Sequence, residues 1–418
     1  MMAPSIWRLV VLVSLAHAMV HIYELSFTGV EQDIAREFFP DDAVRGKEVT
    51  GMLATAWRLP FGFGALLAGW LVDRLGSRRM LTLYLIGCSL CCLASWYSQP
   101  LGLLAFAMFS MGTFASIYHP AGLALISLAT TPDSRARALG IHGIFGSLGI
   151  SAAPFLVGMF LLFAFDWRTY YLVLALPGLL LAIPFYRIAR SEVVGAAATR
   201  PTQPEQDHAL HGLSRSASVS SDLKASHGEE PDLNQWSSFF ALTLLATLQG
   251  FVYASVMSFL KRYLGGGTVE ELDYLAGVSG FLTAGVLVIG CIGQYIGGRI
   301  AHPSRLEAQL TWITLANAPC LVWMGLAMGW QRVAAAASFS VVHFMYQPIY
   351  NSLIAKYTSR RRRSVCYGFS FAMGFGIGGS GATFAGFVHS QLVAYSVLAG
   401  ISVAASLVGA VLWRWAKR

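Results

Sequence analysis

The stretch Gly69-Trp70-Leu71-Val72-Asp73-Arg74-Leu75-Gly76-Ser77-Arg78-Arg79 is a short charged turn between two long apolar segments. The segments occupy residues 50–72 and 80–97, and each is long enough to cross about 30 Å of hydrocarbon as a helix. Charged side chains gather at a membrane surface because they are costly inside it. The stretch therefore predicts a hairpin of two transmembrane helices.

The composition of the whole chain supports a membrane protein. Of the 418 residues, 56% are hydrophobic and 12% are charged, whereas a soluble protein carries roughly 25% charged residues. This excludes an ordinary soluble enzyme. The net charge of +8 is spread between the apolar segments, so we attribute it to membrane topology and expect no nucleic-acid partner.

Apolar segments of spanning length recur twelve times along the chain. We therefore predict an all-α membrane protein with twelve transmembrane helices. The predicted spans are 6–29, 50–72, 80–97, 101–128, 138–164, 168–189, 236–260, 274–299, 306–329, 332–356, 365–388 and 392–413.

The distribution of basic residues predicts the orientation. With the N-terminus inside, 21 Lys and Arg residues fall in inner segments and 7 in outer ones, and basic residues favour the cytoplasmic side. Ala16-His17-Ala18 matches a leader cleavage pattern, but the apolar segment continues beyond it, so we expect a retained first span. We predict a multi-pass protein of a bacterial cytoplasmic membrane with both termini in the cytoplasm.

The chain contains an internal repeat. At an offset of 228 residues, Tyr118 aligns with Tyr346, Pro120 with Pro348 and Gly140 with Gly368. A polar stretch rich in Ser, Ala, Pro and Gln separates the two copies and cannot bury enough apolar surface to fold. We predict two pseudo-symmetric six-helix bundles, residues 1–190 and 235–418, joined by a disordered cytoplasmic linker, residues 191–234.

This organisation and the charged turn resemble the major facilitator superfamily, whose signature between helices two and three is G-x-x-x-D-R-x-G-R-R/K. The turn departs from it at Ser77, and the second-half counterpart, 293–299, lacks the acid. The resemblance implies a secondary transporter that works by alternating access. Asp73, Arg74 and Gly76 would belong to its cytoplasmic gate.

The predicted fifth span carries a Gly- and Pro-rich run that includes Gly143, Gly146, Gly149, Pro154 and Gly158. The run loosely resembles the antiporter motif of exporters in that superfamily, and Pro154 becomes a gating candidate. Close packing of helices through small residues explains it equally well.

Ionisable residues inside the membrane are the main functional candidates. Glu24 in the first span is the only carboxylate that we place well inside a span, and Arg58 in the second span lies at a similar depth. A Glu24–Arg58 pair would either neutralise two costly charges or couple transport to protons. In the second case protonation of Glu24 frees Arg58 for an anionic substrate. His17 and His21 are further proton-coupling candidates.

Tyr118-His119-Pro120 in span four and its repeat counterpart, Tyr346-Gln347-Pro348, predict that His119 and Gln347 face a central cavity. Tyr-His-Pro-x-Gly also resembles the fosmidomycin-resistance type of exporter. A membrane histidine is often a packing residue, so each remains a candidate only. The substrate-binding candidates are Arg58, His119, Tyr118, His142, His343, Gln347 and Asn351.

Gly374–Gly381 contains a GxGxxG pattern but lacks the strand that precedes a nucleotide-binding loop, and no P-loop motif occurs. We expect no enzyme activity, cofactor or metal site, and a monomer whose ligands are protons and a small molecule. The favoured function is proton-coupled export of a small organic solute. Proton-linked uptake of an organic anion and a transport-inactive receptor or scaffold remain alternatives.

Overall fold

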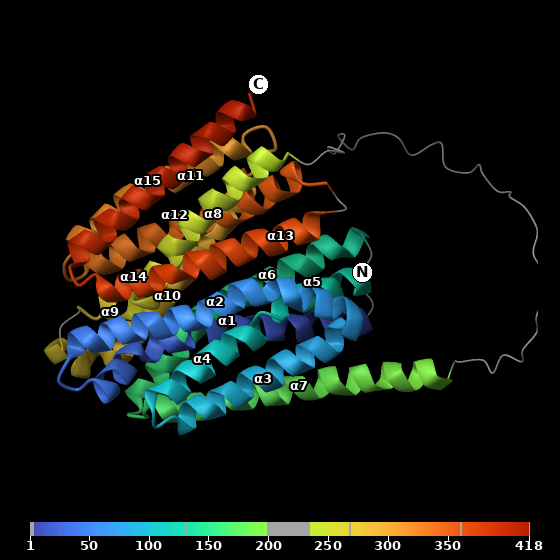
Figure 1. Ribbon diagram of the computed structural model, residues 1–418, viewed down its shortest axis with the longest axis horizontal. Helices are drawn as coiled ribbons and strands as arrows, with labels where there is room; N and C mark the ends of the chain where they lie inside the picture. Colours follow the sequence, from blue (N-terminus) through green and yellow to red (C-terminus); the bar gives the residue numbers. More distant parts are fainter. Residues whose placement is uncertain (1–3, 131, 199–234, 267–268, 360–361, 418) are drawn as a thin grey trace, which may run out of the picture.

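A computed structural model describes residues 4–130, 132–198, 235–266, 269–359 and 362–417. The described residues form long helices that run roughly side by side (Figure 1). The helices of the first half are α1 (Pro4–Phe38), α2 (Ala43–Leu75), α3 (Ser77–Tyr97), α4 (Leu101–Ala115), α5 (Tyr118–Ala129), α6 (Pro132–Leu162) and α7 (Trp167–Ala198).

The second half has the same organisation with two additional breaks. Its elements are α8 (Trp236–Ser258), α9 (Leu260–Leu264), α10 (Val269–Ile300), α11 (Leu306–Leu326), α12 (Gln331–Tyr357), α13 (Arg363–Phe371), the π-helix η1 (Ala372–Ile377), the 3₁₀ turn η2 (Gly378–Ser380), α14 (Gly381–Phe387) and α15 (Gln391–Trp415).

Within the described part, eight segments are both long and apolar enough to cross a membrane, and one of them comprises α4 and α5 together. The other four predicted spans correspond to α2, α11, α12 and the segment from α13 to α14, which lie alongside the first eight (Figure 1). The chain therefore forms twelve crossing segments in two pseudo-symmetric six-helix bundles, as predicted.

Two predicted spans are interrupted helices, and each interruption has a chemical cause. The break between α4 and α5 lies at Ser116 and Ile117, where Pro120 has no N–H to bond the carbonyl of residue 116. The break within 365–388 lies in the glycine run 374–381, because glycine is a poor helix former and relaxes into π and 3₁₀ geometry.

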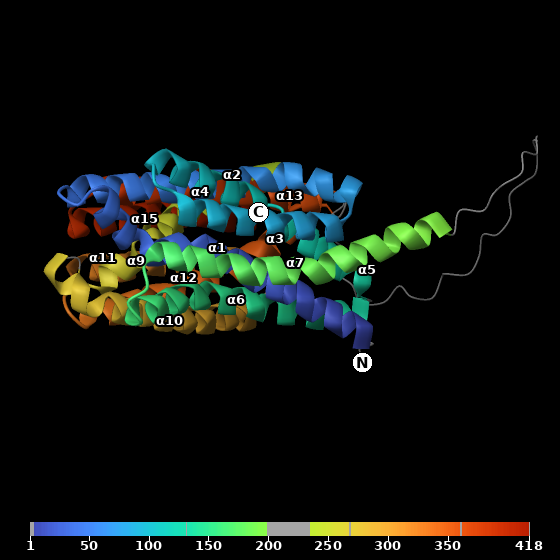
Figure 2. The same ribbon diagram turned by 90° about the horizontal axis from the view of Figure 1, so that it is seen from below.

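The two bundles meet along two pairs of helices. The segment α6 packs against α10, and α2 packs against η1 and α14; the first pair lies together along one side in Figure 2. Glycines allow both approaches. A Cβ on Gly62 would collide with the backbone of Gly376, and a Cβ on Gly280 would lie 2.8 Å from the Pro154 oxygen. Spans two and eleven are thus in close contact.

Several helices extend beyond the predicted boundaries, α1 and α7 most clearly at their C-terminal ends. α1 continues nine residues beyond 29, to Phe38, and α7 continues beyond residue 190, to Ala198. Residues 199–234 of the predicted linker lie outside the described residues, so its disorder stays a prediction. We call the end of the bundle where α1, α6 and α8 finish, near Phe38, Leu162 and Ser258, the distal end.

Candidate functional site

Glu24 lies at the centre of a buried polar cluster between the two bundles. Its carboxylate accepts a hydrogen bond from Arg58 Nη1 at 3.1 Å, lies 2.9 Å from His21 Nδ1, and accepts one from the Tyr253 hydroxyl at 3.3 Å. Glu24 and Arg58 are 4% and 2% exposed. The predicted Glu24–Arg58 pair is therefore formed between α1 and α2, and Tyr253 joins it from α8.

Tyr253 extends the cluster across the bundle interface. The Arg58 guanidinium lies 5.5 Å from the centre of the Tyr253 ring, which is within the range of a cation–π contact. The ring also stacks at 5.9 Å on His343, a buried residue of α12. One tyrosine thus contacts the charged pair of the first bundle and a histidine of the second. Tyr253 was not among the site residues predicted from the sequence.

The predicted histidines of the first bundle lie together. The His17 and His142 rings stack at 3.9 Å, and His17 Nδ1 donates to the His142 carbonyl at 2.8 Å. The Tyr118 hydroxyl donates to the Val13 carbonyl at 2.8 Å and lies 2.9 Å from His142 Nε2. These bonds fasten α5 and α6 to α1.

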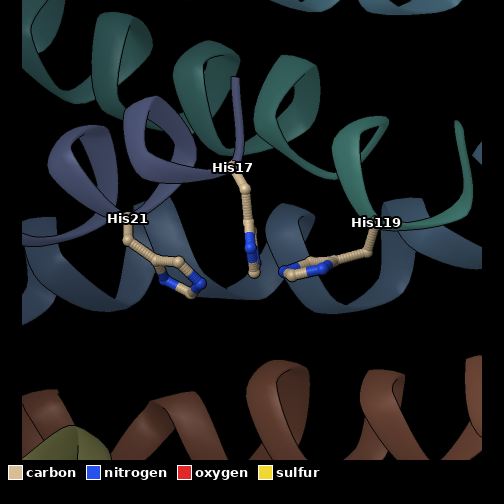
Figure 3. A group of neighbouring side chains, drawn as sticks. All are labelled: His17, His21 and His119. Atoms are coloured by element: carbon tan, nitrogen blue, oxygen red, sulfur yellow. The ribbon is translucent and has the colours of Figure 1, made fainter. Parts of the chain in front are cut away.

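His21 and His119 complete the group beside His17 (Figure 3). Their ring centres are 5.0 Å and 5.4 Å from that of His17. The His119 ring also contacts Phe61 of α2 and Phe371 of α13, at 6.0 Å and 5.2 Å. The histidines therefore face apolar walls contributed by both bundles.

The other candidates on α12 lie apart from this cluster. The Gln347 side chain is exposed and accepts a hydrogen bond from Gln294 of α10, which in turn accepts one from Ser147 of α6. Asn351 is exposed, and its backbone carbonyl accepts a hydrogen bond from Tyr367. Among the described residues, neither side chain is linked by a hydrogen bond to Glu24, Arg58 or the histidines.

The gating candidates of the charged turn are exposed at the end opposite the distal end. Arg74 stacks on Trp70 at 3.8 Å, and Gly76 ends α2 with φ +85°, a conformation that favours glycine. Within the described part of the chain, Asp73 and Arg74 form no ion pair or hydrogen bond with the second bundle. Pro154 lies at the bundle interface, where it lines a void of about 10 Å³ with Met257 and Thr283.

Charged contacts between the bundles lie instead at the distal end, and sequence reasoning missed them. Arg262 donates two hydrogen bonds to Glu31, at 2.8 and 3.1 Å. Lys261 donates to the Gly29 carbonyl at 2.6 Å and lies 3.6 Å from Asp33. Two further contacts are Lys47 with the Val388 carbonyl at 2.7 Å and His389 with Glu48 at 3.5 Å. We call this set the distal clasp.

In the described part of the chain, two further carboxylates are buried besides Glu24, both toward the ends of their helices. Glu31 is 1% exposed within α1, because the helix extends beyond the end of the apolar segment. Glu307 is 2% exposed at the start of α11, where it accepts hydrogen bonds from Lys356 at 2.6 Å and Tyr357 at 2.7 Å. Each additional carboxylate is paired with a cation from another helix, a contact that local hydropathy does not reveal.

A sequence model described as Major Facilitator Superfamily matches residues 43–383 of this chain. The chain belongs to the Major Facilitator Superfamily. The expectation from the charged turn and the repeat is thus confirmed, and the polar cluster lies between the two bundles of a superfamily transporter rather than in an enzyme.

Solved structures show the same fold. The xylose transporter XylE from E. coli, in an inward open conformation, is 11% identical with a TM-score of 0.72, over 98% of this chain and 96% of that one. A bacterial homologue of the human lysosomal transporter Spinster, inward-facing and occupied, is 17% identical with a TM-score of 0.68, over 100% and 98%. At these identities the likeness of this superfamily member to both concerns the fold alone.

One named relative shares sequence over part of the chain. The puromycin resistance protein pur8 of Streptomyces alboniger is 36% identical over 115 residues, which are 27% of this chain and 23% of that protein. The match thus spans less than a quarter of the relative, and its resistance activity is a property of that protein. The resemblance to fosmidomycin-resistance exporters remains a prediction for this superfamily member.

Proposed function

We propose that this chain exports a small organic solute in exchange for protons, by alternating access in a bacterial cytoplasmic membrane. The observation that carries the proposal is the position of Glu24, a buried carboxylate bonded to Arg58 on its own bundle and to Tyr253 on the other. An ionisable group at the bundle interface can link its own protonation to the relative position of the bundles.

In this mechanism Glu24 holds Arg58 while it is ionised. Protonation of Glu24 removes the charge that attracts the guanidinium and weakens the hydrogen bond from Tyr253. In an exchange mechanism the proton and the solute must occupy the site in alternation, so the solute binds while Glu24 is ionised, with Arg58 available to a carboxylate or phosphonate group. Protonation of Glu24 then changes the pair and releases the solute, and loss of the proton restores the solute-binding form. If the anion bound Arg58 only while Glu24 was protonated, proton and solute would move together, as in the uptake alternative.

The distal clasp supports a state that is closed at the distal end. The Lys and Arg distribution favours cytoplasmic termini, so the distal end would face outward and this conformation would be open to the cytoplasm. His119 and His343 would line the path near the pair, while Gln347 and Asn351 would line it nearer the cytoplasm. Asp73, Arg74 and Gly76 would take part when the cytoplasmic end closes, with Pro154 at the moving interface.

Two observations favour export over uptake. The partial match to a protein named for puromycin resistance favours export, because removing a toxic compound from a cell is one route to resistance. The Gly- and Pro-rich run of α6 also favours export by its resemblance to the antiporter motif. Uptake of an organic anion together with protons would use the same Glu24–Arg58 pair and is the alternative.

The test is proton movement in everted membrane vesicles energised by respiration. A panel of small anions and antibiotics, including puromycin and fosmidomycin, is added to vesicles containing wild type, Glu24→Gln or Glu37→Gln. Among the described residues, the Glu37 side chain bonds Trp167 and Arg168 of its own bundle, so Glu37→Gln is the matched control. We expect a compound that collapses the pH gradient with wild type and the control but not with Glu24→Gln.

Arg58→Ala distinguishes a functional pair from a static one. We expect loss of solute-dependent proton movement that Glu24→Gln does not restore in the double variant. Restoration would mean that the pair only balances charge. Normal proton movement in Arg58→Ala, or in Glu24→Gln, would refute the proposed mechanism.

A further inference from the structure

Three histidines from two helices point their rings toward one another (Figure 3). His17 and His21 lie on α1 and His119 lies on α5, and one ring nitrogen of each lies within 4.8 Å of the others. Imidazole nitrogen is a preferred ligand of zinc, copper and nickel. No metal site was predicted from the sequence, in which His119 lies 98 positions after His21 and no short ligand motif joins the three histidines.

Hydrogen bonds at the other ring nitrogens set the orientation of two of these rings. His17 Nδ1 bonds the His142 carbonyl at 2.8 Å, and His21 Nδ1 bonds the Glu24 carboxylate at 2.9 Å. A carbonyl and an ionised carboxylate only accept, so the proton of each ring is on Nδ1. In the neutral form of each ring, Nε2 then carries the lone pair that can bind a metal ion. Histidines that bind metals are held by this kind of bond, to a carbonyl or carboxylate.

The third ring can adjust to an ion. Among the described residues His119 makes no hydrogen bond, and its ring contacts are aromatic, with Phe61 and Phe371. Nitrogens bound to one tetrahedral zinc ion lie about 3.4 Å apart, given bonds of about 2.1 Å. The separations would have to shorten from at most 4.8 Å to about 3.4 Å, and the His119 ring, which no hydrogen bond holds among the described residues, can rotate toward the other two.

We propose that His17, His21 and His119 bind one divalent transition-metal ion, with zinc as the best-suited probe. Glu24 and the His142 carbonyl are the outer partners that orient the ligands, and a water molecule completes the tetrahedron. Because Arg58 shares the Glu24 carboxylate, the charge of the ion is only partly balanced. The site requires no transport activity, so its test is independent of the function proposed above.

The experiment uses the purified full chain in detergent, with an affinity tag that contains no histidine. Equilibrium dialysis measures bound Zn²⁺ and its affinity, and Co²⁺ reports geometry through the intense visible absorption of tetrahedral cobalt. We expect one ion per chain and a tetrahedral cobalt spectrum. His119→Ala, His17→Ala and His21→Ala should each weaken zinc binding by more than about 100-fold. Glu24→Gln, which alters only an outer partner, should weaken it by about 10- to 100-fold.

Two controls locate the binding. His302 lies at the exposed turn before α11, and His208, His211 and His227 belong to the predicted linker. Alanine variants at His302, and at the three linker histidines together, should bind zinc as wild type does. Thermal unfolding without metal checks that each variant is folded. His119→Ala is the key variant because its ring makes no hydrogen bond that folding would lose. Unchanged zinc affinity in folded His119→Ala, or loss of binding in a control, would overturn the proposal.

Discussion

Removal of the Glu31 charge is expected to open the distal clasp. Glu31 is 1% exposed. Its carboxylate accepts two hydrogen bonds from Arg262 and a third from the Thr50 hydroxyl at 2.6 Å. The Arg262 side chain is 18% exposed. In a conformation that separates the bundles at this end, both groups would be solvated. The contact therefore stabilises the closed conformation relative to the open one.

The size of the effect follows from the two bonds to the guanidinium. A hydrogen bond to a charged group contributes about 1.5–3 kcal/mol. Glu31→Gln keeps one acceptor oxygen and loses the charge, so we expect the closed conformation to lose about 2–3 kcal/mol relative to the open one. Since 1.4 kcal/mol is tenfold, the closed-to-open ratio should fall by roughly 30- to 150-fold.

The assay is the distance between spin labels on the two bundles. Val44 at the start of α2 and Leu392 at the start of α15 are 53% and 47% exposed at the distal end, so cysteines there accept labels. Cys291 and Cys320, the partly exposed native cysteines, are first replaced by serine. Wild type should give the short distance of the closed state, and Glu31→Gln should shift the distribution to longer distances.

Two variants make the experiment decisive. Glu37→Gln removes a neighbouring carboxylate whose bonds, within the described part of the chain, are to its own bundle, so it should leave the distances unchanged. Adding Arg262→Gln to Glu31→Gln removes the partly buried cation that has lost its carboxylate and should recover part of the closed population. Identical distance distributions in Glu31→Gln and wild type, or an equal shift in Glu37→Gln, would refute the reasoning.

Two further predictions concern stability. Gly280→Ala places a Cβ 2.8 Å from the Pro154 oxygen and the Gly158 Cα. Because the backbone there cannot move aside, the free energy of unfolding should fall by about 1–3 kcal/mol. The control Gly285→Ala, whose Cβ would meet no neighbouring group within 4 Å, should unfold as wild type does, and equal thermal midpoints of Gly280→Ala and wild type in detergent would contradict this account. Glu307→Gln leaves Lys356 without its carboxylate at 2.6 Å and should lower the unfolding midpoint measurably, whereas an unchanged midpoint would mean that solvent already screens this pair.

Much of the candidate site could be predicted from the sequence, because ionisable residues are costly in an apolar span and the few that occur there are easily recognised as candidates. Glu24 and Arg58 were expected to pair, since they lie at similar depth on adjacent spans, and they lie 3.1 Å apart. His17, His21 and His119 were each predicted as site residues, but their close approach to one another was not. That approach requires α5 to pack against α1, and α5 begins at a break in span four, which was predicted as one continuous helix.

The sequence by itself determined the twelve crossing segments, the repeat and the superfamily, because apolar length and turn motifs are local properties. Tertiary structure alone decided the distal clasp, the link through Tyr253 and the shared geometry of the three histidines. These contacts join residues far apart in the chain, such as Glu31 and Arg262. Their partners are chosen by how the helices of two bundles pack, and that packing is a property of the whole fold rather than of any one span.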